Sequence, residues 1–218
     1  MKPIVIWGIG GHAREVAQLI SDIESHQAGT WALQGFVVDD HATTRNPSPL
    51  PAPMLGGIDW WLARPEVWGV VAVGNPAIRR QITQRLQQSN PALRFATLVH
   101  PMAWVAPSAS LGQGSVVFAH SCISTQVQVG QHASINLACT LSHDTVLGDC
   151  VSLGPGVHLC GGVHIGHDCE LGAGVNVIPN VQIESGVTVG AGAVVTRQLP
   201  AGVTAVGVPA KARDILCE

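Results

Sequence analysis

The second half of the chain repeats with a period of six residues. Every sixth position from 105 to 195 holds a branched aliphatic residue, and these sixteen positions read V, L, V, I, V, I, L, L, L, L, I, L, V, I, V, V. Ala, Ser, Thr, Cys or Val stands two positions before each of them, and glycine follows seven of them. Neither a helix nor an ordinary strand has this period, which is typical of a parallel β-helix built from hexapeptides.

Repeats of this form resemble those of the left-handed β-helix acyltransferases. The resemblance implies three hexapeptides in each triangular coil, so that residues 18 apart stack on one another. The interior of such a prism is filled by its own aliphatic column. Chemistry is therefore expected on the outer walls or between subunits.

The first hundred residues follow a different pattern, in which apolar runs alternate with segments of helical spacing. Strands are expected at 3–9, 35–40, 67–75 and 94–101, and helices at 12–26, 58–65 and 77–88. Strands that alternate with helices predict a parallel α/β sheet, with ligands at the carboxyl ends of the strands. We therefore expect a Rossmann-like domain over residues 1–100 and a β-helix domain over residues 101–218.

Composition narrows the possible partners. The formal net charge is −3, and no Lys or Arg occurs between Arg94 and Arg197, which argues against binding of nucleic acid or of anionic membranes. No apolar run approaches the roughly 20 residues of a membrane helix, and the first residues do not resemble a secretory signal. The six cysteines form no C-x-x-C pair, so we expect reduced thiols and a cytoplasmic protein.

One histidine stands out in the repeats because an aspartate follows it directly. His143 comes two residues after the inward Leu141, so its ring is expected at an outward corner. Imidazole is the usual general base near neutral pH, and an adjacent carboxylate such as Asp144 can fix its tautomer. By the 18-residue register, Gly161 and Gly162 are expected to leave bare backbone beside this ring, which suits the close approach of an extended ligand.

The segment from Asn136 to Val195, together with GVPAK at 207–211, is similar to the sialic acid O-acetyltransferase and UDP-bacillosamine N-acetyltransferase family. The resemblance extends over essentially the whole chain, including GIGGH at 8–12. It implies acetyl-CoA as co-substrate, a nucleotide-sugar acceptor and a homotrimer, with His143 as the base and Asp144 beside it. Asn136 is implied to contact the acceptor sugar.

The same resemblance implies a set of acetyl-CoA contacts. Many relatives have a second histidine nine residues after the base, where this chain has Ser152. The remaining donor contacts are expected at Gly161, Gly162, Ala173, Ala191 and Lys211. Arg197, Lys211 and Arg213 are the cations of the repeat half, so we expect them or backbone amides to hold the phosphates.

The N-terminal domain carries a candidate acceptor site. A glycine turn after the first strand leads into a helix, an arrangement that can present backbone N–H groups to a diphosphate. This turn and the acids after the second strand give the expected nucleotide-sugar contacts: Gly10, Gly11, His12, Asp39 and Asp40.

Three alternatives remain open at this stage. O-acetylation of a sialic acid or another free sugar is possible, and so is a non-catalytic trimer that only binds a nucleotide sugar. His158, His164 and His167 could suggest zinc, but a spacing of six places 158 and 164 on different faces, so no metal is expected. Trp60, Trp61 and Trp68 are expected to pack between the domains.

Overall fold

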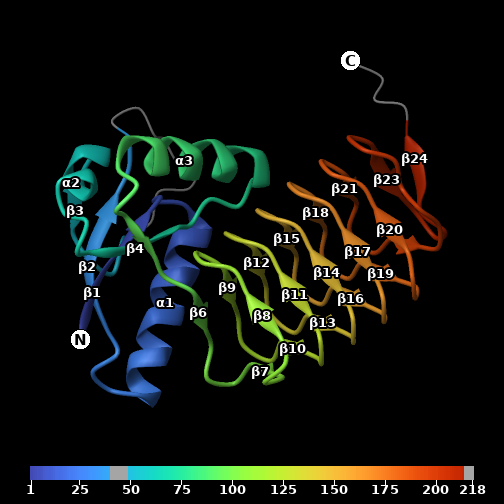
Figure 1. Cartoon of the computed structure of the whole chain (residues 1–218), viewed down its shortest axis with the longest axis horizontal. Coiled ribbons are helices and arrows are strands. Elements are labelled where there is room, and N and C mark those ends of the chain that lie inside the picture. Colours follow the sequence, from blue (N-terminus) through green and yellow to red (C-terminus); the bar gives the residue numbers. More distant parts are fainter. Residues whose placement is uncertain (40–48, 214–218) are drawn as a thin grey trace. The chain divides into compact units, whose positions relative to one another are not determined.

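The computed structural model describes residues 1–39 and 49–213, so the expected contact Asp40 lies outside the described residues. The chain divides into two compact units, Met1–Pro101 and Met102–Glu218. Each unit is described by itself. In both, the parallel strands follow from the apolar patterns of the sequence (Figure 1).

The first unit is an α/β fold around a parallel sheet with strand order β3-β2-β1-β4-β5. The strands are β1 (Lys2–Trp7), β2 (Trp31–Val37), β3 (Met54–Gly56), β4 (Trp68–Val71) and β5 (Arg94–Phe95), followed by β6 (Leu98–Val99). The helices are α1 (Gly11–His26), α2 (Ile58–Leu62) and α3 (Pro76–Ser89). Strands β2 and β3 lie on one side of β1, and β4 and β5 lie on the other. The strand order therefore reverses between β1 and β4, and the carboxyl ends of these two strands form the switch point of the sheet.

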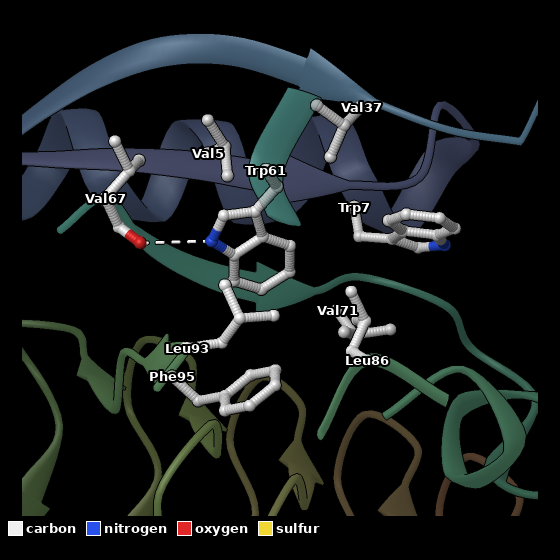
Figure 2. Packing of buried hydrophobic residues seen from close by; sticks show 9 residues of the cluster. All are labelled: Val5, Trp7, Val37, Trp61, Val67, Val71, Leu86, Leu93 and Phe95. Atoms are coloured by element: carbon white, nitrogen blue, oxygen red, sulfur yellow. Dashed lines mark hydrogen bonds between the residues drawn. The ribbon is translucent and has the colours of Figure 1, made fainter. Parts of the chain in front are cut away.

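The side chains of β1 alternate between the two faces of the sheet. Val5 and Trp7 point into a cluster with Trp61, Leu86 and Phe95, on the face that α2 and α3 cover (Figure 2). The Trp61 indole meets the Phe95 ring edge-on at 5.4 Å between centroids, and its Nε1 donates to the Val67 carbonyl at 3.0 Å. Trp61 therefore belongs to the core of the first unit, and its expected role in packing between the domains is wrong.

The second unit is a parallel β-helix with three walls of two- and three-residue strands. Wall I contains β7 (Trp104–Val105), β10 (Cys122–Ile123), β13 (Thr140–Leu141), β16 (His158–Leu159), β19 (Asn176–Val177) and β22 (Val194–Val195). Wall II contains β8 (Ser110–Leu111), β11 (Gln128–Val129), β14 (Val146–Leu147), β17 (His164–Ile165) and β20 (Gln182–Ile183). Wall III contains β9 (Val116–Val117), β12 (Ser134–Ile135), β15 (Ser152–Leu153), β18 (Glu170–Leu171), β21 (Thr188–Val189), β23 (Thr204–Val206) and the antiparallel β24 (Lys211–Arg213).

The six-residue pattern produces this prism directly. Each two-residue strand ends on an aliphatic residue of the pattern, and the aliphatic positions from Val117 to Val195 are at most 5% exposed. Strands pair with those 18 residues away, as Thr140 and Leu141 do with His158 and Leu159. One coil is thus 18 residues long, and successive coils bury one continuous aliphatic column.

The corners of the prism show a second regularity, which lies in the backbone. The third residue after each inward aliphatic has a positive φ at fourteen consecutive corners, from Gly114 to Gly192. Eight of these residues are not glycine, and Asp144, Asp168 and Asn180 are among them. Asn and Asp are the side chains that best tolerate this left-handed conformation, which explains part of the choice of corner residues.

Candidate active site

His143 and Asp144 form a hydrogen-bonded pair at the corner between wall I and wall II. Asp144 has φ +60°, and its Oδ2 lies 2.8 Å from Nδ1 of His143. The side chains of His143 and Asp144 are 66% and 64% exposed. Since the carboxylate accepts a hydrogen bond from Nδ1–H, the neutral imidazole presents a bare Nε2 to a reactant.

The next coil supplies the surface on which the His143 ring rests. A Cβ on Gly161 would lie 2.5 Å from both Cε1 and Nε2 of His143, closer than side chains tolerate. The backbone locks this arrangement, since the Gly162 amide donates to the His143 carbonyl at 2.9 Å. The bare surface expected at Gly161 is therefore occupied, in this structure, by the imidazole itself.

Gly162 has a comparable partner in the following coil. A Cβ on Gly162 would collide with the side-chain Oδ1 of Asn180. The backbone N–H of Asn180 donates to the Gly161 carbonyl at 3.0 Å. The two glycines therefore allow His143 from one side and Asn180 from the other to approach the same backbone. Asn180 is not among the residues expected from the sequence, although its spacing of 18 from Gly162 could have indicated it.

Most of the expected sugar and donor contacts border wall I. His143, Asp144, Gly161 and Gly162 lie along its corner with wall II. Asn136, Ala173 and Ala191 lie along its other corner, with wall III, and Ala173 and Ala191 are exposed. Two expected donor contacts lie elsewhere, because Ser152 is in β15 and Lys211 is in β24, both on wall III.

The expected acceptor site of the first unit lies at the switch point of its sheet. Gly10 is the N-cap of α1, and a Cβ added there would meet nothing within 4 Å. Gly8 has φ +121°, and a Cβ there would come within 2.9 Å of the Ala72 carbonyl oxygen. The loops after β1 and β4 thus approach each other closely, while the start of α1 stays open at Gly10 and Gly11 for a ligand.

Family models match both units. The PglD N-terminal domain model matches residues 3–86, and the model of the bacterial transferase hexapeptide (six repeats) matches residues 144–178 and 164–197. Among solved structures, a histidine-to-asparagine variant of perosamine N-acetyltransferase from Caulobacter crescentus, in complex with CoA and GDP-perosamine, is 32% identical. Its TM-score is 0.85, and the match covers 97% of each chain.

The chain belongs to the family of hexapeptide-repeat sugar N-acetyltransferases. The acetyltransferase domain of PglB from Neisseria gonorrhoeae, in complex with acetyl coenzyme A, is also similar, at 34% identity and a TM-score of 0.85 over 97% of this chain and 99% of that one. These neighbours and the hexapeptide match confirm the predicted architecture, a Rossmann-like domain followed by a left-handed β-helix.

Curated members of the family resemble the chain over shorter stretches. UDP-N-acetylbacillosamine N-acetyltransferase from Bacillus subtilis is 32% identical over 130 residues, which span 55% of this chain and 52% of that protein. GDP-perosamine N-acetyltransferase from Escherichia coli O157:H7 is 31% identical over 159 residues, or 69% of this chain and 66% of that protein. The matched part of the chain thus spans about half to two thirds of these curated relatives.

Two expected acceptor residues have protein partners in the first unit. Nδ1 of His12 lies 3.2 Å from Oε2 of Glu15, and this contact lowers the pKa of the Glu15 carboxyl. Asp39 accepts a hydrogen bond from Nη2 of Arg85 at 2.7 Å, and the Arg85 guanidinium lies 5.5 Å from the centroid of the Trp7 ring. Sequence reasoning missed Arg85, because its helical spacing in α3 gives no sign that it reaches the end of β2.

Wall I carries polar side chains that the sequence analysis left without a role in binding. Thr140, His158 and Asn176 stack in register on its outer surface. Oγ1 of Thr140 lies 2.9 Å from Nδ1 of His158. The spacing of 18 residues was the signal that could have placed His158 beside Thr140.

The histidines considered as metal ligands are distributed around the prism. His158 lies on wall I, His164 on wall II, and His167 at the corner between walls II and III. Over residues 1–39 and 49–213, no group of three or more His, Cys, Asp and Glu side chains is arranged to hold a metal ion.

Five cysteines of the β-helix are free thiols, and they differ in exposure. Cys122 and Cys160 are exposed, whereas Cys139, Cys150 and Cys169 are buried. Burial raises the pKa of the Cys139 thiol to about 11 and that of Cys169 to about 11. Both thiols are therefore protonated near neutral pH, which suits packing rather than nucleophilic chemistry.

Among the described helices, none combines the length and the apolar composition needed to cross a bilayer.

Proposed function

We propose that this chain transfers an acetyl group from acetyl-CoA to the amino group of a nucleotide-linked amino sugar. The observation that carries the proposal is the His143–Asp144 pair, whose imidazole rests on Gly161 at the edge of wall I. The same wall is bordered by Asn136 and by most of the expected acetyl-CoA contacts. The matched relatives are named as N-acetyltransferases of UDP- and GDP-linked sugars, which supports the same reaction here.

In this mechanism His143 acts as a general base. Nε2 accepts a proton from the acceptor nitrogen while that nitrogen attacks the thioester carbonyl, so that a C–N bond forms. The C–S bond then breaks, and the proton passes from the imidazolium to the departing thiolate of CoA. Asp144 keeps Nδ1 protonated throughout and stabilises the imidazolium.

In this proposal the first unit binds the nucleotide part of the acceptor, and the second unit binds acetyl-CoA and the sugar. Gly10, Gly11 and the start of α1 receive the diphosphate, and Asp39 with Arg85 lies at the nucleoside end of the same strand edge. Asn136 contacts the acceptor sugar. Acetyl-CoA contacts Gly161, Gly162, Ala173 and Ala191 beside wall I, and Ser152 and Lys211 from wall III.

We further propose that the active form is a homotrimer. Gly161 and Gly162 lie at the corner of wall I that is remote from wall III, whereas Ser152 and Lys211 lie on wall III of the same prism. A neighbouring copy that places its wall III opposite wall I would complete the site, and closed cyclic symmetry would repeat the contact. Since acetyl-CoA and nucleotide sugars are cytoplasmic metabolites, we place the enzyme in the cytoplasm.

The decisive experiment measures CoA release from acetyl-CoA in the presence of a panel of UDP- and GDP-linked amino sugars. We expect turnover with at least one of them and an acetamide in the product by mass spectrometry. Acetylation of a hydroxyl of a free sugar instead would establish O-acetylation. Binding of the nucleotide sugars without any CoA release would favour a non-catalytic role.

A further inference from the structure

The outer surface of wall I between the two corners described above carries its own polar column. Thr140, His158 and Asn176 are the outward residues of three successive strands, β13, β16 and β19. Gly161 follows His158 by three residues at one corner, and Ala173 precedes Asn176 by three residues at the other. A ligand that touches both Gly161 and Ala173 therefore crosses the wall beside His158 and Asn176.

The His158 ring is held in a defined orientation although it is exposed. Its Nδ1 bonds Oγ1 of Thr140 at 2.9 Å, so the ring leans along the wall toward the coil that carries His143. Nε2 is then left for another partner, and the structure shows none among the described residues. The neighbouring Asn176 has one of its Nδ2 donors engaged with the Gly174 carbonyl at 2.9 Å.

Charge indicates which part of the donor crosses this wall. No Lys or Arg occurs between Arg94 and Arg197, so the coils that carry His143 and His158 offer no cation to a phosphate. The pantetheine arm of CoA is uncharged and carries amide groups, each with a carbonyl acceptor and an N–H donor. The His158 imidazole, whose Nδ1 is bonded to Thr140 and whose Nε2 is available, can form a hydrogen bond with such an amide group.

We infer that His158, oriented by Thr140, binds an amide of the pantetheine arm of the acyl donor. The inference rests on the proposed function in that acetyl-CoA is the donor. In this proposal His158 contributes to the affinity for the acyl donor. Thr140 is a positioning residue, which acts by orienting the His158 ring.

The test is calorimetric binding of CoA to the full chain in the absence of any sugar, with His158→Ala and Thr140→Val. Loss of a single hydrogen bond to a ligand predicts an increase in Kd of about tenfold for His158→Ala. Thr140→Val should weaken binding by about threefold, because the imidazole remains but is no longer oriented. In turnover, KM for acetyl-CoA should rise in parallel, and KM for the sugar should stay within about twofold of wild type.

Gln128→Ala is the matched control, since Gln128 is the exposed first residue of a two-residue strand on wall II. It should leave CoA binding unchanged, and circular dichroism should show that all three variants are folded. The inference is overturned if His158→Ala binds CoA within twofold of wild type, or if KM rises equally for both substrates. Failure of the proposed function is a separate result, since it would appear as wild-type protein that acetylates no nucleotide-linked amino sugar.

Discussion

The imidazole of His143 lies on the α-carbon of Gly161, one coil further along the chain. This face contact acts together with the 2.8 Å hydrogen bond from Nδ1 to Asp144, which holds the ring by its edge. One contact fixes where the plane of the ring lies, and the other fixes which nitrogen faces the reactants. The imidazole that we propose as the base is therefore oriented by Asp144, the next residue in the chain, and by Gly161, one coil away.

Gly161→Ala should disturb catalysis although it replaces no catalytic side chain. The added methyl would lie 2.5 Å from two ring atoms of His143, so the imidazole must move away from its place on the backbone. We expect kcat to fall by about 10²-fold, the order that follows from misplacing a catalytic group by about 1 Å. Gly156→Asn is the control, because nothing lies within 4 Å of a Cβ at that corner and asparagine tolerates its φ of +66°. Equal loss of activity in both variants would attribute the effect to folding instead.

Replacement of the base itself should have the largest effect on turnover. His143→Ala should lower kcat by about 10²–10⁴-fold, since the general base is removed, with little change in thermal stability. Asp144→Asn should lower kcat less, because the imidazole remains and only the preference for its Nδ1-protonated tautomer is weakened. Asparagine also tolerates the left-handed backbone conformation of this corner. Steady-state kinetics of both variants against wild type are the measurement. A His143→Ala enzyme with more than half of the wild-type kcat would remove His143 from this role.

Gly10→Leu should weaken binding of the nucleotide sugar but not that of CoA. The space beside Gly10 is open in the first unit, so the leucine fits the protein but fills the place expected for the diphosphate. We expect KM for the nucleotide sugar to rise by at least about tenfold, whereas the Kd of CoA measured by calorimetry should stay within twofold. An unchanged KM would show that the acceptor binds elsewhere.

The thiols of the β-helix should fall into two classes. At neutral pH, a maleimide should label Cys122 and Cys160 in the folded protein and leave Cys139, Cys150 and Cys169 unlabelled, as peptide mapping can show. Labelling of Cys139 should accelerate only as the pH approaches about 11 or when the chain unfolds, because burial raises the pKa of this thiol. Rapid labelling of Cys139 at pH 7 would contradict the buried position found here.

The sequence predicted the β-helix well because one residue in six had to fill a continuous column. Each of the sixteen aliphatic positions from 105 to 195 carries that requirement separately, so the signal accumulates over many coils. In the first unit, the helical spacing of the apolar residues likewise predicted the helices. The strand β3 (Met54–Gly56) was missed because three residues bordered by prolines and glycines carry too little pattern.

The candidate site was predictable only where two residues are neighbours or 18 apart. His143 and Asp144 are adjacent, and Gly161 follows from the register. Asp39 and Arg85 are 46 residues apart on a strand end and a helix, and no periodicity links them. The partner of Trp61 was misjudged for the same reason, since its pairing with Phe95 depends on how α2 and β5 meet.

The 18-residue coil restricts how this enzyme can change in length. A deletion of six residues after Gly161 would preserve the aliphatic column, yet every later segment would pass to a neighbouring wall. Ala173 and Ala191 would then leave the border of wall I, while His143 would stay in place. Only gains or losses of whole coils keep Ala173 and Ala191 on the border of the wall that carries His143, so this architecture can lengthen in steps of 18 residues without separating them.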